Sequence, residues 1–302
     1  MIVEPITQEN LASYEKVSPP KAERSNFYYS FSFLPREERK AITSIYAFCS
    51  YIDDIVDGTP SDTVNQISKK MDRLAWWENE IENIYERNYN SPLIMPFVAV
   101  IKRFGIPKQY FHTMIDGVRR DLVQTRYETF DELKEYCYSV ASVVGLISIE
   151  IFGYKYEETK NYAINLGYAL QLTNILRDIK FDKERGYIYL PQEELRRFNY
   201  SEKDLIAEKY NEAFVEFMRF QTKRARSYYH SARKYLRPDE KQTIVAAEIM
   251  DSIYFRLLEK IELNEFNVYD KKIRVSTAHK MLTAMKHWIS VKMFIKRIKS
   301  HR

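Results

Sequence analysis

Residues 169–191 read ALQLTNILRDIKFDKERGYIYLP, and this stretch decides the fold. It places Asn174, Asp178 and Asp182 four residues apart. On a helix of about 3.6 residues per turn, side chains at this spacing lie along one face. Carboxylate and amide oxygens are the ligands that a hard cation such as Mg²⁺ takes in proteins. Apolar residues fill the positions between them, so the stretch predicts a metal-binding helix face that borders a buried interior.

A second carboxylate pair lies far upstream, in the segment YIDDIVDG at 51–58. Asp53 and Asp57 are also four residues apart, in a helical stretch that is apolar on several sides. A buried carboxylate is costly unless it is paired or bound to a metal. The alternatives are a solvated acidic turn for this pair and a surface ladder of ion pairs for the downstream row. Because both motifs share one spacing, we expect two facing helices that hold metal ions and a diphosphate between them.

The composition of the 302-residue chain indicates an all-α protein. Hydrophobic residues make up 45 %, which is enough for a sizeable core. The 7 glycines and 10 prolines are too few for the many tight turns of a sandwich, a barrel or a doubly wound sheet. Lys and Arg number 47 against 42 Asp and Glu, and this mild excess does not indicate a nucleic acid partner.

Cysteine usage and targeting patterns favour a cytoplasmic protein. Cys49 and Cys137 lie within apolar helical patterns and not in a CxxC pair, so neither a disulfide scaffold nor a zinc site is expected. The N-terminal sequence lacks the basic-then-apolar pattern of a signal peptide. No run of about 18 apolar residues occurs, so no bilayer-spanning segment is expected. The absence of GxGxxG and P-loop patterns predicts that no nucleotide cofactor is bound.

Prolines, glycines and apolar spacing divide the chain into helices of a single domain over 1–302. Residues 1–24 are expected to form a loosely structured lead-in, because Pro19 and Pro20 bar a long helix. Helical periodicity and end signals predict helices over 35–58, 61–90, a shorter stretch between 92 and 105, 108–127, 133–152, 157–181, 201–236, 238–264 and 276–298.

Several side chains near the two motifs belong either to the core or to a substrate site. Tyr46 and Tyr136 each lie in an apolar helical stripe, one turn from an important helix position. Ala141 and Gly145 leave a shallow groove, which gives either close helix packing or room for a long apolar tail. The aromatic cluster that begins at Phe27 is either core or the cap of a pocket mouth.

Together these segments resemble the squalene/phytoene synthase family, the head-to-head prenyl transferases of the isoprenoid-synthase fold. The matching segments are SNFYYSFSFLPREERKAITSIYAFCSYIDDIVDG, YCYSVASVVGLISIEIFG and YALQLTNILRDI with YLP. The aspartate motif alone also occurs in other prenyl transferases and terpene cyclases, whereas YCYSVA and QLTNILRD are far more specific. The YYSFSFLP, WW and IEIFGY segments are most similar to bacterial presqualene diphosphate synthases of hopanoid pathways. The resemblance implies an all-α, single-domain helical bundle around a central apolar cavity.

The resemblance implies a transferase that depends on Mg²⁺, with Mn²⁺ as the alternative ion. Two molecules of farnesyl diphosphate would bind in one apolar cavity and be joined head to head to presqualene diphosphate. Metal ions would neutralise the first diphosphate and pull it off, leaving an allylic cation that the double bond of the second substrate attacks. The apolar wall would exclude water from that cation. The implied metal ligands are Asp53, Asp57, Asn174, Asp178 and Asp182.

The resemblance also implies roles for residues around the metal ligands. Tyr136 and Tyr46 are implied at the reacting centre, and Arg177 is implied on the diphosphate. The other positions implied to contact substrate are Phe27, Ser50, Ala141, Gly145, Gln171, Arg185 and Tyr187.

Three positions depart from the family pattern. The family usually has arginine at the positions of Ser50 and Tyr187, and glutamate at the position of Phe181. Two arginines expected to bind phosphate through strong, charge-assisted hydrogen bonds are therefore missing. The candidates to replace them are Arg185, Lys271, Lys272 and Arg274.

Two other functions stay open at this point, and so do two locations for the C-terminal helix. The same condensation with a different final product or substrate chain length would give squalene, dehydrosqualene or phytoene. Alternatively, the chain is a non-catalytic member of the family that serves as a lipid-binding or assembly protein. The expected partners are farnesyl diphosphate and downstream enzymes of the squalene pathway. The helix at 276–298 mixes apolar residues with lysines, so it is either packed on the domain or attached peripherally to anionic lipid at the inner membrane surface.

Overall fold

The structure is a computed structural model that describes residues 26–57, 63–89 and 94–299. The expected lead-in at 1–24 lies outside these residues. The helices in chain order are α2 (Asn26–Phe31), α3 (Arg36–Val56), α4 (Val64–Glu86), α5 (Met95–Phe104), α6 (Lys108–Arg120), α7 (Phe130–Cys137), the π-helical turn η3 (Tyr138–Ser142), α8 (Val143–Phe152), α9 (Glu158–Glu184), α10 (Gln192–Arg197), α11 (Glu202–Ile206), α12 (Glu212–Tyr235), α13 (Val245–Leu263) and α14 (Thr277–Lys299).

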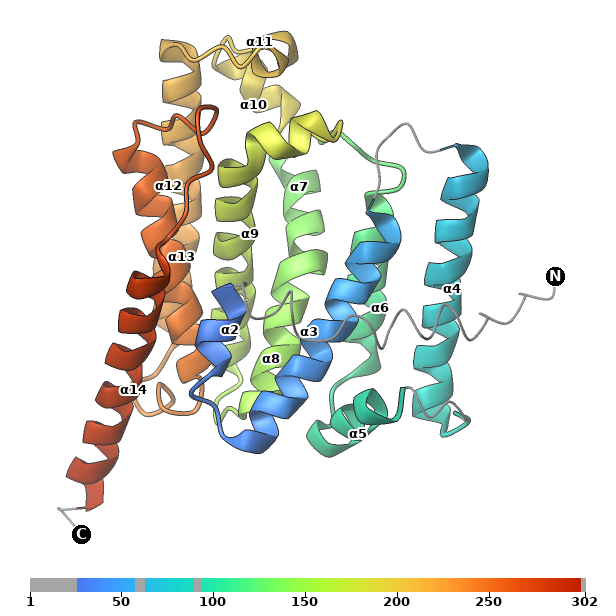
Figure 1. Ribbon diagram of the computed structural model, residues 1–302, viewed down its shortest axis with the longest axis vertical. Helices are drawn as coiled ribbons and strands as arrows, with labels where there is room; N and C mark the ends of the chain where they lie inside the picture. Colours follow the sequence, from blue (N-terminus) through green and yellow to red (C-terminus); the bar gives the residue numbers. More distant parts are fainter. Residues whose placement is uncertain (1–25, 58–62, 90–93, 300–302) are drawn as a thin grey trace.

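Helix α9 is the central element of the bundle (Figure 1). It packs most extensively against α12, η3 and α8, and it also contacts α13 and α7. Its buried residues are distributed around the helix, as expected for a helix that neighbours enclose on several sides. The buried side chains of the described residues form one hydrophobic cluster that extends from Leu34 to Ala284. The all-α prediction is confirmed, and the only bridge of β type in the described part is an isolated one between Arg126 and Ile188.

Local signals in the sequence account for several helix ends. Thr63 caps α4 in a full capping box with Gln66, in which each side chain accepts a hydrogen bond from the other residue's backbone N–H. Gly105 ends α5 in the left-handed region at φ 61°, which a residue without Cβ adopts at little cost. Pro35 precedes α3, whose first turn holds Glu37 and Glu38 at the positive end of the helix.

The helix predicted over 133–152 is interrupted by the π-helical turn η3. At this turn the chain passes very close to two neighbouring helices. A Cβ on Gly117 of α6 would lie 2.4 Å from the Cβ of Ser139, and a Cβ on Gly167 of α9 would lie 2.4 Å from the Cα of Ser142. Ser142 also donates a hydrogen bond from Oγ to the carbonyl oxygen of Ile164 at 2.8 Å. The two glycines therefore allow α6 and α9 to contact the backbone of η3.

Three predicted helix ranges are wrong in detail. The helix expected over 108–127 ends at Arg120, and the one expected over 238–264 begins only at Val245. The segment 201–236 forms two helices, because Glu208 adopts φ 53° after α11 and Asn211 then caps α12. Residues 121–127 and 207–211 contain no glycine or proline to mark the turn, and Pro238 is followed by a turn over 238–244 and not directly by a helix.

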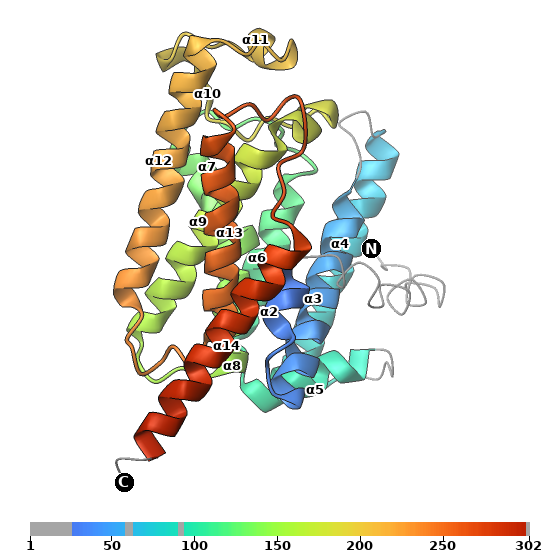
Figure 2. The same ribbon diagram turned by 60° about the vertical axis from the view of Figure 1, so that its left-hand side comes forward.

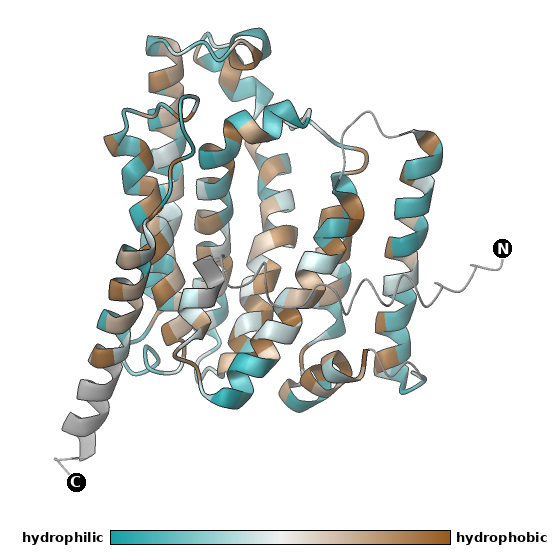
Figure 3. Ribbon diagram, in the orientation of Figure 1, coloured by the Kyte–Doolittle hydropathy of each residue, from teal (hydrophilic) through white to brown (hydrophobic). Residues whose placement is uncertain are grey.

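The segment Phe130–Phe152 is the one helical stretch of the described residues with the length and composition of a membrane span. An 18-residue window within it has a mean hydropathy of 1.4, and 56 % of that window is buried inside the bundle. That burial is typical of a core helix in a water-soluble bundle, so the segment is weak support for a membrane span. Figure 3 shows its apolar residues within the bundle.

The crossing of α9 and η3 makes a stability prediction. Gly167→Ala should lower the free energy of unfolding by about 1–3 kcal/mol, because the added methyl group would overlap backbone atoms of Ser142 that cannot rotate away. Urea unfolding followed by circular dichroism measures the change. Asn161→Ala, at an exposed position of the same helix, should leave the free energy of unfolding within about 0.5 kcal/mol. Equal effects of the two substitutions would contradict this account of the crossing.

Candidate active site

An apolar cavity of about 290 Å³ lies between α3, η3, α8, α9 and α13. One end is lined by Ser50 and Asp53 of α3 and by Asn174 of α9. The other end is lined by apolar and aromatic side chains that include Phe152 and Tyr162. Asn174 and Tyr162 are twelve residues apart on α9, and at about 1.5 Å per residue the cavity follows the helix for roughly 18 Å. The cavity is therefore long, apolar along its length and polar at one end.

The structure places seven of the predicted site residues on the cavity wall. Their side chains are half-buried, apart from that of Asp53, which is exposed to the cavity. They are Tyr46, Ser50, Asp53, Ala141, Gly145, Gln171 and Asn174. Phe27 belongs to α2, but its side chain lies outside what the structure describes. The predicted groove provides both space for an apolar chain and close helix packing. Ala141 and Gly145 line the cavity, while neighbouring Ser142 packs against α9.

Asp53 is a carboxylate under electrostatic strain at the polar end of the cavity. Its side chain is accessible to water from the cavity, yet protein atoms surround it, so much of its hydration is lost. Burial, together with the negative charges of Asp121 and Asp57, raises the pKa of Asp53 to about 7. On α9 the Oδ1 atom of Asn174 is buried and has no hydrogen-bond partner within the described residues. Both side chains thus present oxygen atoms that the protein itself does not satisfy.

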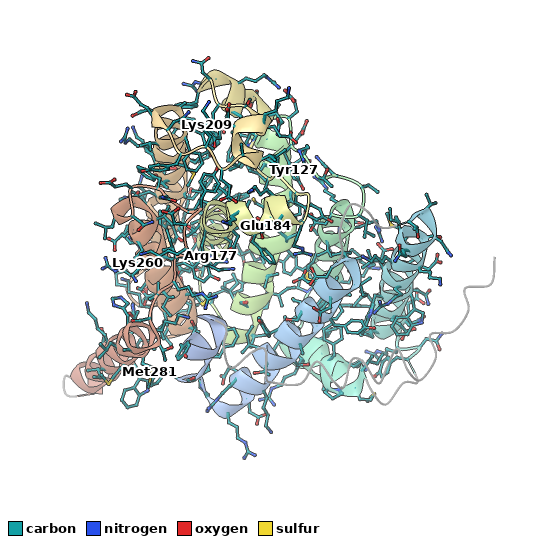
Figure 4. All side chains as sticks on the ribbon, turned by 45° about the horizontal axis from the view of Figure 1, so that its top comes forward. Tyr127, Arg177, Glu184, Lys209, Lys260 and Met281 are labelled. Carbon is teal, nitrogen blue, oxygen red and sulfur yellow. The ribbon has the colours of Figure 1, made fainter. Side chains whose placement is uncertain are left out.

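Asp178 has two cationic partners. Arg177 donates a hydrogen bond from Nε to Asp178 Oδ1 at 3.0 Å, and its Nη2 pairs with the other carboxylate oxygen. Lys272, from the segment between α13 and α14, lies 2.9 Å from Asp178 Oδ1. Burial would raise the pKa of Asp178, but the hydrogen bonds and charges of Arg177 and Lys272 outweigh it and lower that pKa. Figure 4 shows Arg177 on α9 at the centre of the bundle, seen from this end.

Asp182 and Asp57 lie at the ends of α9 and α3. Burial and the charge of Asp178 raise the pKa of Asp182 to about 7. Arg185 donates a hydrogen bond from Nη2 to Asp57 Oδ1 at 2.7 Å, so the end of α9 is joined to the end of α3. The two predicted motifs therefore do lie on facing helix ends, as their spacing predicted.

Two of the three positions that depart from the family pattern, Phe181 and Tyr187, lie around Arg185. Its guanidinium carbon lies 5.4 Å from the ring centroid of Phe181 and 6.0 Å from that of Tyr187. Tyr187 is buried and donates its hydroxyl to the backbone oxygen of Asp121 at 2.9 Å. Arg185 and Lys272 therefore provide the positive charge near the carboxylates, whereas Lys271 and Arg274 are exposed and have no ion pair in the described part of the chain.

The sequence did not reveal Asp121, which the structure places beside the site. Tyr136 donates its hydroxyl to Asp121 Oδ2 and Tyr189 donates to Oδ1, each at 3.0 Å. Burial raises the pKa of Asp121 to about 6, even though these two hydrogen bonds lower it. Asp121 lies just past the end of α6, within a helix that was expected to continue to residue 127, so no sequence signal marked it. Tyr136 itself lies behind the cavity wall, bound to Asp121.

At the polar end of the cavity, a divalent cation would have to take its oxygen ligands from several helices. No group of three or more His, Cys, Asp or Glu side chains among the described residues is close enough to hold a metal ion alone. A bound cation would give the unpartnered oxygen of Asn174 a binding partner. Its positive charge would also stabilise the ionised carboxylates of Asp53 and Asp182, whose pKa values are raised without it. Oxygen donors of this kind suit Mg²⁺, which usually keeps several waters and takes other ligands from substrate phosphates.

A helical bundle around an apolar cavity, with carboxylates and arginines at one end, defines the class of isoprenoid synthases. The sequence profile of the squalene/phytoene synthase family matches residues 20–279, and the chain belongs to this family. Members of the family are prenyl transferases that bind prenyl diphosphates and generally depend on Mg²⁺.

Individual relatives cover most of the chain. Phytoene synthase of Arthrospira platensis is 38 % identical over 272 residues, which is 85 % of this chain and 85 % of that protein. A dehydrosqualene synthase crystallised with ligand is 27 % identical, with a TM-score of 0.75 over 96 % of this chain and 98 % of that one. Squalene synthase HpnC of Alicyclobacillus acidocaldarius is 23 % identical and shares the fold, with a TM-score of 0.73 over 86 % of this chain and 95 % of that one.

The raised pKa of Asp182 predicts how stability changes with pH when no metal is present. The folded protein keeps this proton between about pH 4 and pH 7, whereas the unfolded chain, with a pKa of about 3.9, has lost it. Asp182 should therefore destabilise the fold progressively as pH rises through this window. In EDTA, Asp182→Asn should raise the free energy of unfolding at pH 8 by about 1–3 kcal/mol and leave it nearly unchanged below about pH 4.

Urea unfolding at a series of pH values tests this prediction. Asp72→Asn, which alters an exposed carboxylate on α4, serves as the matched control and should show no such trend. A gain for Asp182→Asn that is the same at low and high pH would be inconsistent with ionisation of Asp182 as its cause.

The hydrogen bond between Tyr136 and Asp121 predicts a measurable coupling. In a double-mutant cycle with Tyr136→Phe and Asp121→Asn, the unfolding free energies should be non-additive by about 0.5–3 kcal/mol, because the bond is buried. Tyr156 and Asp239 make the same 3.0 Å bond at the surface, and the cycle with Tyr156→Phe and Asp239→Asn should give less than about 0.5 kcal/mol. Additive effects at the buried pair would show that Asp121 does not hold Tyr136.

Proposed function

We propose that this protein is a Mg²⁺-dependent prenyl transferase that joins two geranylgeranyl diphosphates head to head to give phytoene. The observation that carries the proposal is the pairing of an apolar cavity with facing carboxylate motifs at one end. The choice of substrate is supported by the similarity to phytoene synthases, such as that of Arthrospira platensis. The expected product of the sequence interpretation, presqualene diphosphate, is the second candidate.

The residues at the polar end would bind and orient the diphosphate of the first substrate. Mg²⁺ bound through Asp53, Asp57, Asn174, Asp178 and Asp182 would neutralise the leaving diphosphate. Arg177, Arg185 and Lys272 already lie against these carboxylates and would contact phosphate oxygens. The missing arginines at Ser50 and Tyr187 are compensated in this arrangement, which favours an enzyme over a non-catalytic relative.

The cavity wall would protect the reactive cation from water. An allylic cation formed at the polar end would face mainly apolar and aromatic side chains, because Ile45, Leu166 and Leu170 and most of their neighbours line the cavity below it. Such a wall excludes the water that would quench the cation. The double bond of the second substrate would then attack the cation, and loss of a proton would close a cyclopropane ring that still carries the second diphosphate. Release of that diphosphate, rearrangement of the ring and loss of a further proton would give phytoene.

Farnesyl diphosphate is the competing substrate. The structural similarity to a dehydrosqualene synthase at 27 % identity supports it, as does the resemblance of several segments to presqualene diphosphate synthases. The two candidates share the polar end of the site and differ in the length of the chain that the cavity must accept.

The purified full-length protein should release diphosphate from a prenyl diphosphate only when Mg²⁺ is added. Asp53→Asn and Asp178→Asn should each lower the rate by at least about 100-fold, while Asp72→Asn should leave it unchanged. Products formed separately from the C15 and C20 substrates are identified by mass spectrometry and compared by kcat/KM. We expect phytoene from the C20 substrate at the higher kcat/KM.

Each result decides between the candidates. A higher kcat/KM for the C15 substrate, with presqualene diphosphate as the product, would favour the second candidate. Absence of diphosphate release from both substrates, with the two aspartate variants behaving like wild type, would reject the enzyme altogether.

A further inference from the structure

Helix α14 presents an apolar stripe to the outside of the molecule. The stripe consists of four large side chains whose exposed fractions are 58, 59, 46 and 41 %: Met281, Leu282, Met285 and Ile289. On a helix these positions share one face. The adjoining side of the helix, which is turned toward the bundle, holds Ala284, which is buried, and Trp288, whose ring lies 5.8 Å from that of Phe33. One face of α14 therefore packs on the protein, and the other places apolar side chains in water.

The inner face of α14 covers elements that form the cavity wall. It contacts α13 and α2, and Lys280 Nζ lies 5.4 Å from the ring centroid of Tyr29. Ala246 and Met250 of α13 and Phe31 of α2 line the cavity. In Figures 1 and 2 α14 runs along the edge of the bundle, and its C-terminal end projects beyond the other helices. Met281 lies at the periphery of the molecule (Figure 4).

The charge of the chain is concentrated around this helix. Residues 271–302 contain ten Lys and Arg and no Asp or Glu. The first 270 residues hold the remaining 37 Lys and Arg against 42 Asp and Glu, so they are net negative although the whole chain is net positive. Lys286, which follows the stripe residue Met285, is exposed and makes no ion pair within the described residues. The apolar stripe thus lies in a segment whose charged residues are all Lys and Arg.

We propose that α14 docks this protein onto a bilayer surface rich in anionic lipid. A helix with an exposed apolar face and basic residues lies in the plane of the interface, with its apolar side chains at the boundary between headgroups and acyl chains. Lysine side chains reach from there to lipid phosphates, and each contributes attraction to an anionic surface. The apolar stripe of α14 complements the acyl chains of the bilayer, and the ten Lys and Arg of residues 271–302 complement its anionic headgroups.

The same features argue against other occupants. A second copy of the chain seated on the stripe would bring two cationic segments together, and like charges across an interface are unfavourable. A nucleic acid would pair with the lysines but leave the apolar stripe in water. The stripe residues and Lys286 neither line the cavity nor contact its carboxylates, and Lys272 is the one residue of the basic segment that pairs with a carboxylate of the described site, so the docking does not depend on the proposed function.

Co-sedimentation of the full-length protein with vesicles tests the proposal. Vesicles of phosphatidylcholine with about one third phosphatidylglycerol should pellet the protein, and vesicles of phosphatidylcholine alone should bind it at least about tenfold more weakly. Raising the salt to about 0.5 M should weaken binding, because charge attraction is screened. Leu282→Ser/Ile289→Ser and Lys286→Glu should each reduce binding by about tenfold.

Matched variants distinguish docking by α14 from general stickiness. Ile206→Ser/Leu263→Ser removes side chains exposed by 54 and 72 % on other helices, and Lys223→Glu reverses an exposed charge on α12. These variants should bind vesicles like wild type. Circular dichroism and diphosphate release in vesicle-free buffer should be unchanged for all variants, so a loss of docking is separable from a loss of folding or of activity.

Three results would overturn the proposal. The first is equal binding to neutral and anionic vesicles. The second is full binding by the α14 variants. The third is sedimentation equilibrium showing that wild type self-associates through α14, with the Leu282→Ser/Ile289→Ser variant monomeric and wild type not bound to vesicles.

Discussion

Crowded carboxylates at one end of an apolar cavity are the constraint on which the rest of this structure depends. Asp53, Asp121 and Asp182 come from three different helices or helix ends, and each has a raised pKa because surrounding protein atoms displace much of its water and other carboxylates lie nearby. Repulsion of this kind would push the helices apart if nothing opposed it. The close crossing of α9 with η3 and the apolar packing of the bundle hold them in place.

The protein neutralises only part of this charge by itself. Arg177 and Lys272 pair with Asp178, and Arg185 pairs with Asp57, while Asp53 has no cationic partner in the described structure. Negative charge without a partner in a low-dielectric setting binds a divalent cation favourably. In the proposed function, the arginines that pair with carboxylates here would turn to phosphate oxygens of a metal-bound diphosphate.

The sequence predicted the parts of this site that local spacing encodes. The four-residue spacing in each motif places its members on one helix face, and the apolar residues around it indicate burial, so the pattern supported the prediction that α3 and α9 face each other across one site. Asp121 could not be found in that way, because its position depends on α6 ending at Arg120, where no glycine or proline marks the end. The turn η3 also lacks a sequence signal, since a single π-helical turn of five residues is too short to show a periodicity of its own.

The departures from the family pattern and the charge of the C-terminal segment have a common physical explanation. Tyr187 replaces an expected arginine with a ring that stacks at 5.9 Å on Tyr189, whose hydroxyl binds Asp121, so this position supports the carboxylates by packing. Positive charge reaches the site instead from Arg185 and from Lys272, which lies at the start of the stretch 271–302 that contains no acidic residue. That stretch then continues into α14, whose outer face carries the apolar stripe. One segment therefore supplies a cation to the polar end of the cavity and, a few turns later, a cationic and apolar face on the outside of the same wall.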